Sequence, residues 1–133
     1  MNFRLSRDNK SITIAGMNAQ PHRTDKDVLI IEADDSINDD ATTTFVENLE
    51  NEVASGKHKK IILDCSKIEF LSSYGLSMIL RLRNATNMAK GELKLCGLNM
   101  ILDRLLSMSK VNHLFKQYSD VETARVAFGK PAR

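Results

Sequence analysis

Short apolar runs alternate along the chain with longer stretches in which apolar residues recur every three or four positions. The short runs are typical of buried β-strands, and the recurring spacing is typical of amphipathic helices. Strands are predicted at residues 28–31, 61–63, 92–96 and 114–118. Helices are predicted between Asn38 and Gly56, Gly75 and Gly91, Asn99 and Met108, and Ser119 and Phe128.

Regular alternation of strands and helices favours βαβ units, and therefore a sheet with right-handed crossovers. We predict an α/β fold: a single domain with a mostly parallel central sheet of four to five strands and about four helices. A chain of 133 residues has room for one such core. The domain is predicted over 27–128, followed by a tail at 129–133. Residues 1–26 are predicted to form an N-terminal extension or edge strands, with candidate strands at 3–5 and 11–15.

Two local predictions rest on composition and spacing. The polar segment 64–67 is predicted to be a turn after the second strand, followed by a short extended run at 68–71. In the third helix, the apolar spacing predicts that the face toward the core is formed by Ile101, Leu102, Leu105 and Met108.

Charge and composition narrow the classes of partner. The 19 basic and 17 acidic residues give a net charge of +2, too small for a protein that binds nucleic acid by neutralising phosphates. Only 5% of residues are aromatic and none is Trp, so there are few rings for base stacking. No stretch reaches the roughly 18 apolar residues that span a bilayer, and the first residues do not resemble a signal peptide. We therefore expect a cytoplasmic protein with no nucleic acid partner and no membrane insertion.

The sequence lacks the common patterns of nucleotide, metal and catalytic sites. Neither a P-loop nor a Gly-x-Gly-x-x-Gly pattern is present, and the three histidines are scattered without metal-ligand spacing. Cys65 and Cys96 stand apart at the ends of apolar runs, which favours reduced thiols in the core over a disulfide or a metal site. We expect no cofactor, no metal and no enzymatic activity. A serine nucleophile at a strand-to-helix turn is the alternative, although Leu71 occupies the first glycine position of Gly-x-Ser-x-Gly.

The segment from residue 61 to residue 80 carries the most functional information. In it, the polar break Ser72-Ser73-Tyr74-Gly75 leads directly into a helical pattern. The two hydroxyls of Ser72 and Ser73 are thus at or beside a helix N-terminus, where backbone N–H groups lack partners and the dipole is positive. A phosphate on either serine would be stabilised there. From these residues alone, a phosphorylatable hydroxyl and a simple N-cap both remain open.

The ordered pattern resembles the STAS domain, the family of bacterial anti-sigma factor antagonists and of the cytoplasmic domains of sulfate transporters. The family pattern has an apolar strand, Asp-x-Ser, four variable residues, and then Asp-Ser-Ser/Thr-Gly-Leu. The matching positions in this chain are Asp64, Ser66, Ser73, Gly75 and Leu76. The resemblance extends from about residue 27 to residue 128.

This resemblance implies an anti-sigma factor antagonist, a non-enzymatic switch that sequesters an anti-sigma factor with serine kinase activity. Phosphorylation would inactivate the antagonist, and a phosphatase would restore it. The implied phosphoacceptor is Ser73. The implied partner-binding residues are Ser36, Asn38, Ser72, Tyr74, Gly75 and Leu76.

Three positions at the implied switch differ from the family pattern. Ser72 replaces the acidic residue before the phosphoacceptor, and Tyr74 replaces the second hydroxyl residue. Asn38 replaces an acidic residue in the loop after the first main strand. A second function therefore stays open: a STAS scaffold or transport-complex subunit without a phosphorylation switch. For Tyr74 itself, an exposed interface anchor and a position at the edge of the core both stay open.

Overall fold

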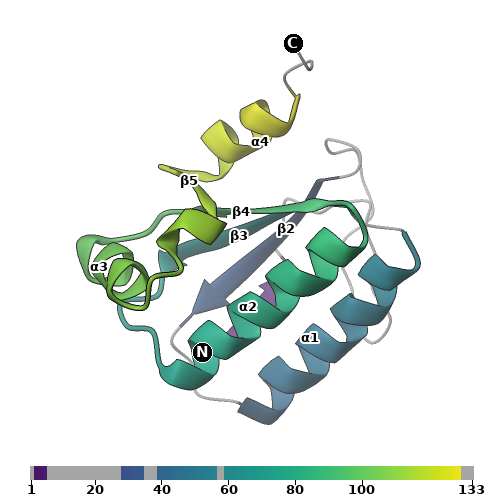
Figure 1. Ribbon diagram of the computed structural model, residues 1–133, viewed down its shortest axis with the longest axis horizontal. Coiled ribbons are helices and arrows are strands. Elements are labelled where there is room, and N and C mark those ends of the chain that lie inside the picture. Colours follow the sequence, from purple (N-terminus) through teal and green to yellow (C-terminus); the bar gives the residue numbers. More distant parts are fainter. Residues whose placement is uncertain (1, 6–27, 35–38, 57–58, 130–133) are drawn as a thin grey trace.

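The computed structural model describes residues 2–5, 28–34, 39–56 and 59–129. Within them, a five-stranded sheet with the order β1-β2-β3-β4-β5 lies between helices (Figure 1). The strands are β1 (Asn2–Leu5), β2 (Val28–Asp34), β3 (Lys60–Lys67), β4 (Glu92–Cys96) and β5 (Lys116–Tyr118). β1 is antiparallel to β2, and the other neighbouring pairs are parallel. The predicted mostly parallel sheet is thus confirmed, and the candidate strand at 11–15 lies outside the described residues.

Four α-helices connect or follow these strands in the described part of the chain. They are α1 (Asp39–Ala54), α2 (Ser73–Met88), α3 (Met100–Met108) and α4 (Val121–Gly129), with a short 3-10 helix η1 (Asn112–Leu114) before β5. Helices α1 and α2 lie side by side on one face of the sheet, and α4 lies on the opposite face (Figure 1). The order of strands and helices agrees with the order predicted from the sequence.

The sheet is buried on both faces, which explains the continuous apolar runs of its central strands. Leu29 and Ile31 of β2 point into the larger core, whereas Val28 and Ile30 join a smaller core with Ala124 of α4. The larger core also contains side chains from the neighbouring strands and from the three helices α1, α2 and α3: among them Leu49, Ile61, Leu63, Leu82, Leu93, Leu95, Leu102 and Leu106.

The predicted turn at 64–67 is wrong, because these residues continue β3. Asp64 pairs with Cys96 of β4, and Lys67 pairs with Asp34 of β2, beyond an irregularity in that ladder. A central strand has neighbours on both sides that satisfy its backbone groups, and this pairing overrides the polar composition of the segment.

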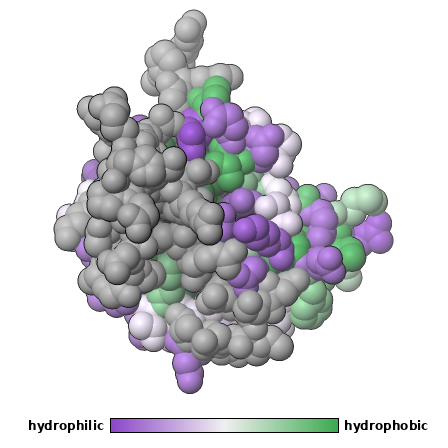
Figure 2. All heavy atoms as spheres, turned by 180° about the vertical axis from the view of Figure 1, so that it is seen from behind, coloured by the Kyte–Doolittle hydropathy of each residue, from purple (hydrophilic) through white to green (hydrophobic). Residues whose placement is uncertain are grey.

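The predicted inner face of the third helix is also wrong in part. Leu102 and Leu106 are buried, while Ile101 is 58% and Met108 is 73% exposed. Six of the nine residues of this helix are apolar, and they do not fall on a single face, so spacing alone does not determine its rotation. From behind, hydrophobic side chains are visible among hydrophilic ones at the edge of the molecule where α3 lies (Figure 2).

Cys65 and Cys96 are buried free thiols, as predicted. Although they lie on adjacent strands, Cys65 belongs to the larger core and Cys96 to the smaller one, on the other face of the sheet. Burial raises the pKa of both thiols, that of Cys96 to about 12. Both therefore stay protonated at neutral pH and are poor nucleophiles.

In the described part of the chain, no helix combines the length and the apolar character needed to cross a bilayer.

Candidate functional site

The segment between β3 and α2 is held in place from both ends. Ile68 and Leu71 are buried, whereas Glu69 and Phe70 between them are exposed. The side-chain amide of Asn99, at the start of α3, donates a hydrogen bond to the carbonyl of Ile68 at 3.3 Å. Packing and this hydrogen bond therefore determine where α2 begins.

Ser72 and Ser73 have different structural roles at the start of α2. Ser72 is the N-cap, with an extended backbone, and its hydroxyl oxygen accepts a hydrogen bond from the Gly75 N–H at 3.0 Å. Ser73 is the first helical residue, and its side chain is exposed. Within the described residues, its hydroxyl has no hydrogen-bond partner. The sequence left open a simple N-cap and a phosphorylatable hydroxyl. In the structure, Ser72 is the N-cap, and Ser73 has the exposed hydroxyl.

The electrostatic surroundings of Ser73 favour added negative charge. The helix that it begins is 16 residues long, and its first turn contains no acidic side chain. A helix of this length presents the equivalent of about half a positive charge at its N-terminus. A phosphate on Ser73 would therefore meet a favourable field from the helix.

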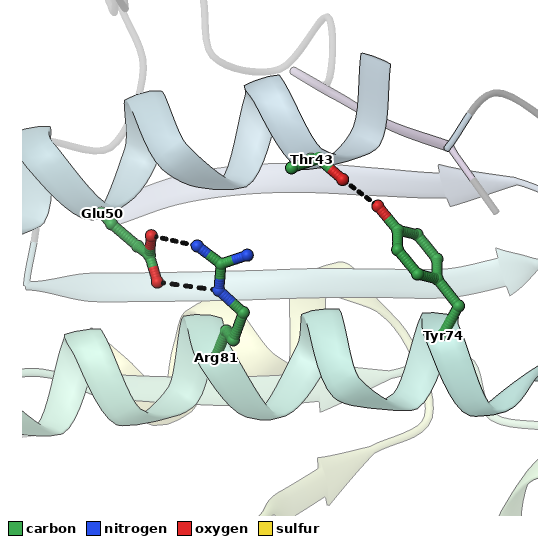
Figure 3. Close-up of polar contacts among 4 residues, drawn as sticks. All are labelled: Thr43, Glu50, Tyr74 and Arg81. Carbon is green, nitrogen blue, oxygen red and sulfur yellow. Dashed lines mark hydrogen bonds and ion pairs between the residues drawn. The ribbon is translucent and has the colours of Figure 1, made fainter. Parts of the chain in front are cut away.

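The three predicted partner-binding residues that follow Ser73 in α2 are less accessible than Ser73. Tyr74 is half-buried, its ring packs against the larger core, and its hydroxyl forms a hydrogen bond with Thr43 of α1 (Figure 3). Of the two positions left open for Tyr74, the structure therefore shows the one at the edge of the core. Gly75 is buried, and Leu76 is partly buried against the same core.

Ser36 and Asn38, the predicted partner-binding residues of the β2–α1 connection, lie outside the described residues.

A second polar contact joins α1 and α2 further along the two helices. Arg81 donates two hydrogen bonds to the carboxylate of Glu50, at 3.2 and 2.7 Å (Figure 3). Its hydrogen bond with Glu50 raises the pKa of Arg81, so the guanidinium remains charged. The Glu50–Arg81 pair and the contact of Thr43 with Tyr74 could not be predicted from the sequence. The partners are 31 residues apart, so they leave no local pattern.

Asp64 and Ser66 of the family pattern lie in a different environment from Ser73. The Asp64 carboxylate accepts a hydrogen bond from the Ser66 N–H at 3.0 Å. Both residues line an open pocket of about 490 Å³, together with Asp120 and with Glu122 and Arg125 of α4. Among the described residues, no three histidine, cysteine or acidic side chains are placed to hold a metal ion.

Substitutions of the two serines are expected to differ in their effect on stability. Ser72→Ala should lower the free energy of unfolding by about 1 kcal/mol, because the Gly75 N–H loses its acceptor. Ser73→Ala should change it by less than about 0.5 kcal/mol, because its side chain is exposed. Urea denaturation of both variants measures the difference. Equal losses would contradict the assignment of Ser72 as the cap.

Comparison with known families identifies the domain. The family model of the STAS domain matches residues 19–124 of this chain. The chain belongs to the STAS domain family. A search of curated protein sequences returned no match.

Solved structures with the same fold include bacterial antagonists and a larger protein. TM1081 of Thermotoga maritima, described as an anti-sigma factor antagonist, superposes with a TM-score of 0.70 at 22% identity, covering 83% of this chain and 94% of that one. The phosphorylated form of the Bacillus cell-fate determinant SpoIIAA gives 0.66 at 12% identity, covering 82% and 96%. SLC26A9 gives 0.63 at 14% identity, covering 96% of this STAS domain chain but 24% of that protein. These similarities establish the STAS fold of the chain.

Proposed function

We propose that this STAS domain protein is an anti-sigma factor antagonist that is switched off by phosphorylation of Ser73. The observation that carries the proposal is the exposed Ser73 hydroxyl on the first residue of α2, next to a separate capping serine. In the unmodified state, the surface around Ser73 binds an anti-sigma factor with serine kinase activity in the cytoplasm. The bound anti-sigma factor is then unavailable to its sigma factor.

The partner performs the chemistry, and the STAS domain is its substrate. The Ser73 oxygen attacks the terminal phosphorus of a nucleoside triphosphate held by the kinase. A new P–O bond forms, the nucleoside diphosphate leaves, and the hydroxyl proton passes to a base of the kinase. The added phosphate carries close to two negative charges, and a phosphatase would remove it.

The phosphate acts on the complex through desolvation and charge. At the N-terminus of α2 it is tolerated by the free protein, because the helix end stabilises negative charge. At the centre of an interface the same charge must lose water, and burial of an unpaired charge costs several kcal/mol. Modification therefore favours the free state without unfolding the domain.

The named structures are consistent with this proposal. SpoIIAA, which has the same fold, is described as an anti-sigma factor antagonist in an unphosphorylated form, and its phosphorylated form also has a structure. The sequence motif, the fold and the exposed serine of this chain together support the same kind of switch.

Phosphorylation of the purified protein tests the proposal. Incubation with its cognate kinase and ATP, followed by mass spectrometry of tryptic peptides, should locate one phosphate on Ser73. Ser73→Ala should abolish incorporation, whereas Ser72→Ala should retain it because Ser72 serves as the cap. Incorporation at another residue, or incorporation that persists in Ser73→Ala, would refute the proposal.

A STAS scaffold or transport-complex subunit is the second candidate function. It is favoured by the likeness to SLC26A9, of which the chain covers 24%, and by Ser72 at the usual acidic position. In that case Ser73 would contribute to a permanent contact, and its charge state would not control binding.

A further inference from the structure

We propose that Tyr74 is a positioning residue for the phosphoacceptor, because its hydrogen bond to Thr43 fixes the first turn of α2 against α1. This inference rests on the proposed function of Ser73 and extends it to the regulation of the same site. The resemblance to the family gives Tyr74 no such role, since the family has a smaller hydroxyl residue there.

The side chain of Tyr74 combines packing with a directional contact. Its ring packs against the larger core, and its hydroxyl reaches Thr43 on the neighbouring helix, 31 residues earlier in the chain (Figure 3). Consecutive residues of a helix point about 100° apart. Once Tyr74 is directed toward α1, Ser73 must point to a different side of α2, which is the exposed one. The inward position of Tyr74 therefore determines the outward position of Ser73.

The Thr43–Tyr74 bond is one of two contacts in the same register. Glu50 lies seven residues after Thr43 on α1, and Arg81 lies seven residues after Tyr74 on α2. Seven residues make about two helical turns, so the parallel helices are joined at matching points about 10 Å apart along their axes. The first contact is made by Tyr74, the residue after Ser73 in the chain, and the second is made by Arg81 farther along α2 (Figure 3). The two therefore differ in distance from the phosphoacceptor while both joining α1 to α2.

The first turn of a helix depends on such tertiary contacts. Its N–H groups lack intrahelical partners, so helix ends open more easily than helix centres. At the start of α2, the hydrogen bond from the Gly75 N–H to Ser72 stabilises the backbone of the first turn. The hydrogen bond between Tyr74 and Thr43 fixes this turn against α1. Loss of the Tyr74 hydroxyl should leave the ring packed but make opening of the first turn more frequent. A kinase would then meet Ser73 in several orientations and bind the substrate less well.

Two measurements on the full chain test this proposal. Tyr74→Phe and Thr43→Val each remove the hydrogen bond with little change in shape. Both should speed amide exchange of the Gly75 and Leu76 N–H groups, which are bonded to Ser72, about fivefold, the equivalent of about 1 kcal/mol for one hydrogen bond. With the kinase that modifies the wild type, both should raise KM for the protein substrate, by at most about fivefold, and leave kcat nearly unchanged. The double variant should behave like either single variant, because both remove the same contact.

Glu50→Ala is the matched control, because it removes the second contact between the same helices. It should leave exchange at Gly75 and Leu76, and KM, close to wild-type values, even if it lowers global stability. Unchanged exchange in Tyr74→Phe, or an equal rise in KM for Glu50→Ala, would overturn the proposal. If the wild type is not phosphorylated on Ser73, the proposed function fails, and the exchange rates alone then decide whether Tyr74 holds the first turn.

Discussion

Phosphorylation of Ser73 is expected to weaken the complex with the partner anti-sigma factor at least about 100-fold. An unpaired, desolvated charge costs several kcal/mol, and each 1.4 kcal/mol changes the dissociation constant tenfold. The hydroxyl of Ser73 is exposed, so the neutral variant Ser73→Ala should bind almost as well as the wild type. Ser73→Asp carries less charge than a phosphate and should lie between them. Titration calorimetry with the purified partner measures all four forms.

Asn87→Asp provides the control for this charge effect. Asn87 is exposed in the last turn of the same helix, so its replacement adds one negative charge far from Ser73 along α2. It should leave the affinity nearly unchanged. Equal binding by the wild type, Ser73→Ala and Ser73→Asp would instead favour the scaffold function. A similar loss for Ser73→Asp and Asn87→Asp would indicate long-range repulsion between the proteins.

Gly91→Ala is expected to lower the free energy of unfolding by about 3 kcal/mol or more, at the upper end of overpacking effects. A Cβ atom at this position would lie 2.3 Å from the Lys59 carbonyl oxygen and 2.8 Å from its Cα. These are backbone atoms of the residue just before β3, and the Glu92 N–H donates to the same carbonyl at 2.7 Å. Relief of the clash would therefore disturb the pairing of β3 with β4. Urea denaturation of the variant and of the wild type measures this change in the free energy of unfolding.

Gly56→Ala separates this steric effect from backbone conformation. Gly56 has φ of +84°, but an added Cβ would meet no atom within 4 Å. Its replacement should cost only about 1–2 kcal/mol, the penalty of a left-handed backbone for a residue with a Cβ. A loss for Gly91→Ala no greater than that for Gly56→Ala would show that the β3–β4 connection adapts to the extra atom.

The end of α2 before Gly91 agrees with the sequence, but the need for glycine at this position comes from the tertiary structure. The sequence indicated a helix stop at Gly91, which is typical of a left-handed C-terminal glycine. The helix does end before Gly91, but the left-handed residue is Lys90, with φ of +64°. Gly91 is required because the backbone of Lys59 approaches it closely. Such an approach between distant segments cannot be found from local composition.

The starts of the helices could be predicted more securely, because they depend on neighbouring residues. Asn99 caps α3 by accepting from the Leu102 N–H, at the residue where the sequence predicted that this helix begins. The last helix was predicted to open at Ser119, whereas in the structure it is Asp120, one residue later, that accepts a hydrogen bond from the Thr123 N–H at the start of α4. A cap needs only a side chain and an N–H two or three residues later. The rotation of α3 depends on distant packing, and here the prediction of its inner face was wrong in part.

By itself, the sequence determined the alternation of strands and helices, the parallel sheet and the helix start that carries the candidate phosphoacceptor. These features follow from periodicity and from contacts within a few residues, which the chain encodes locally. Only the tertiary structure decided that Ser73 faces outward and that Tyr74 reaches Thr43. The physical reason is that α1 and α2 approach each other only after both pack on the same face of the sheet, so side-chain directions depend on residues far apart in the chain.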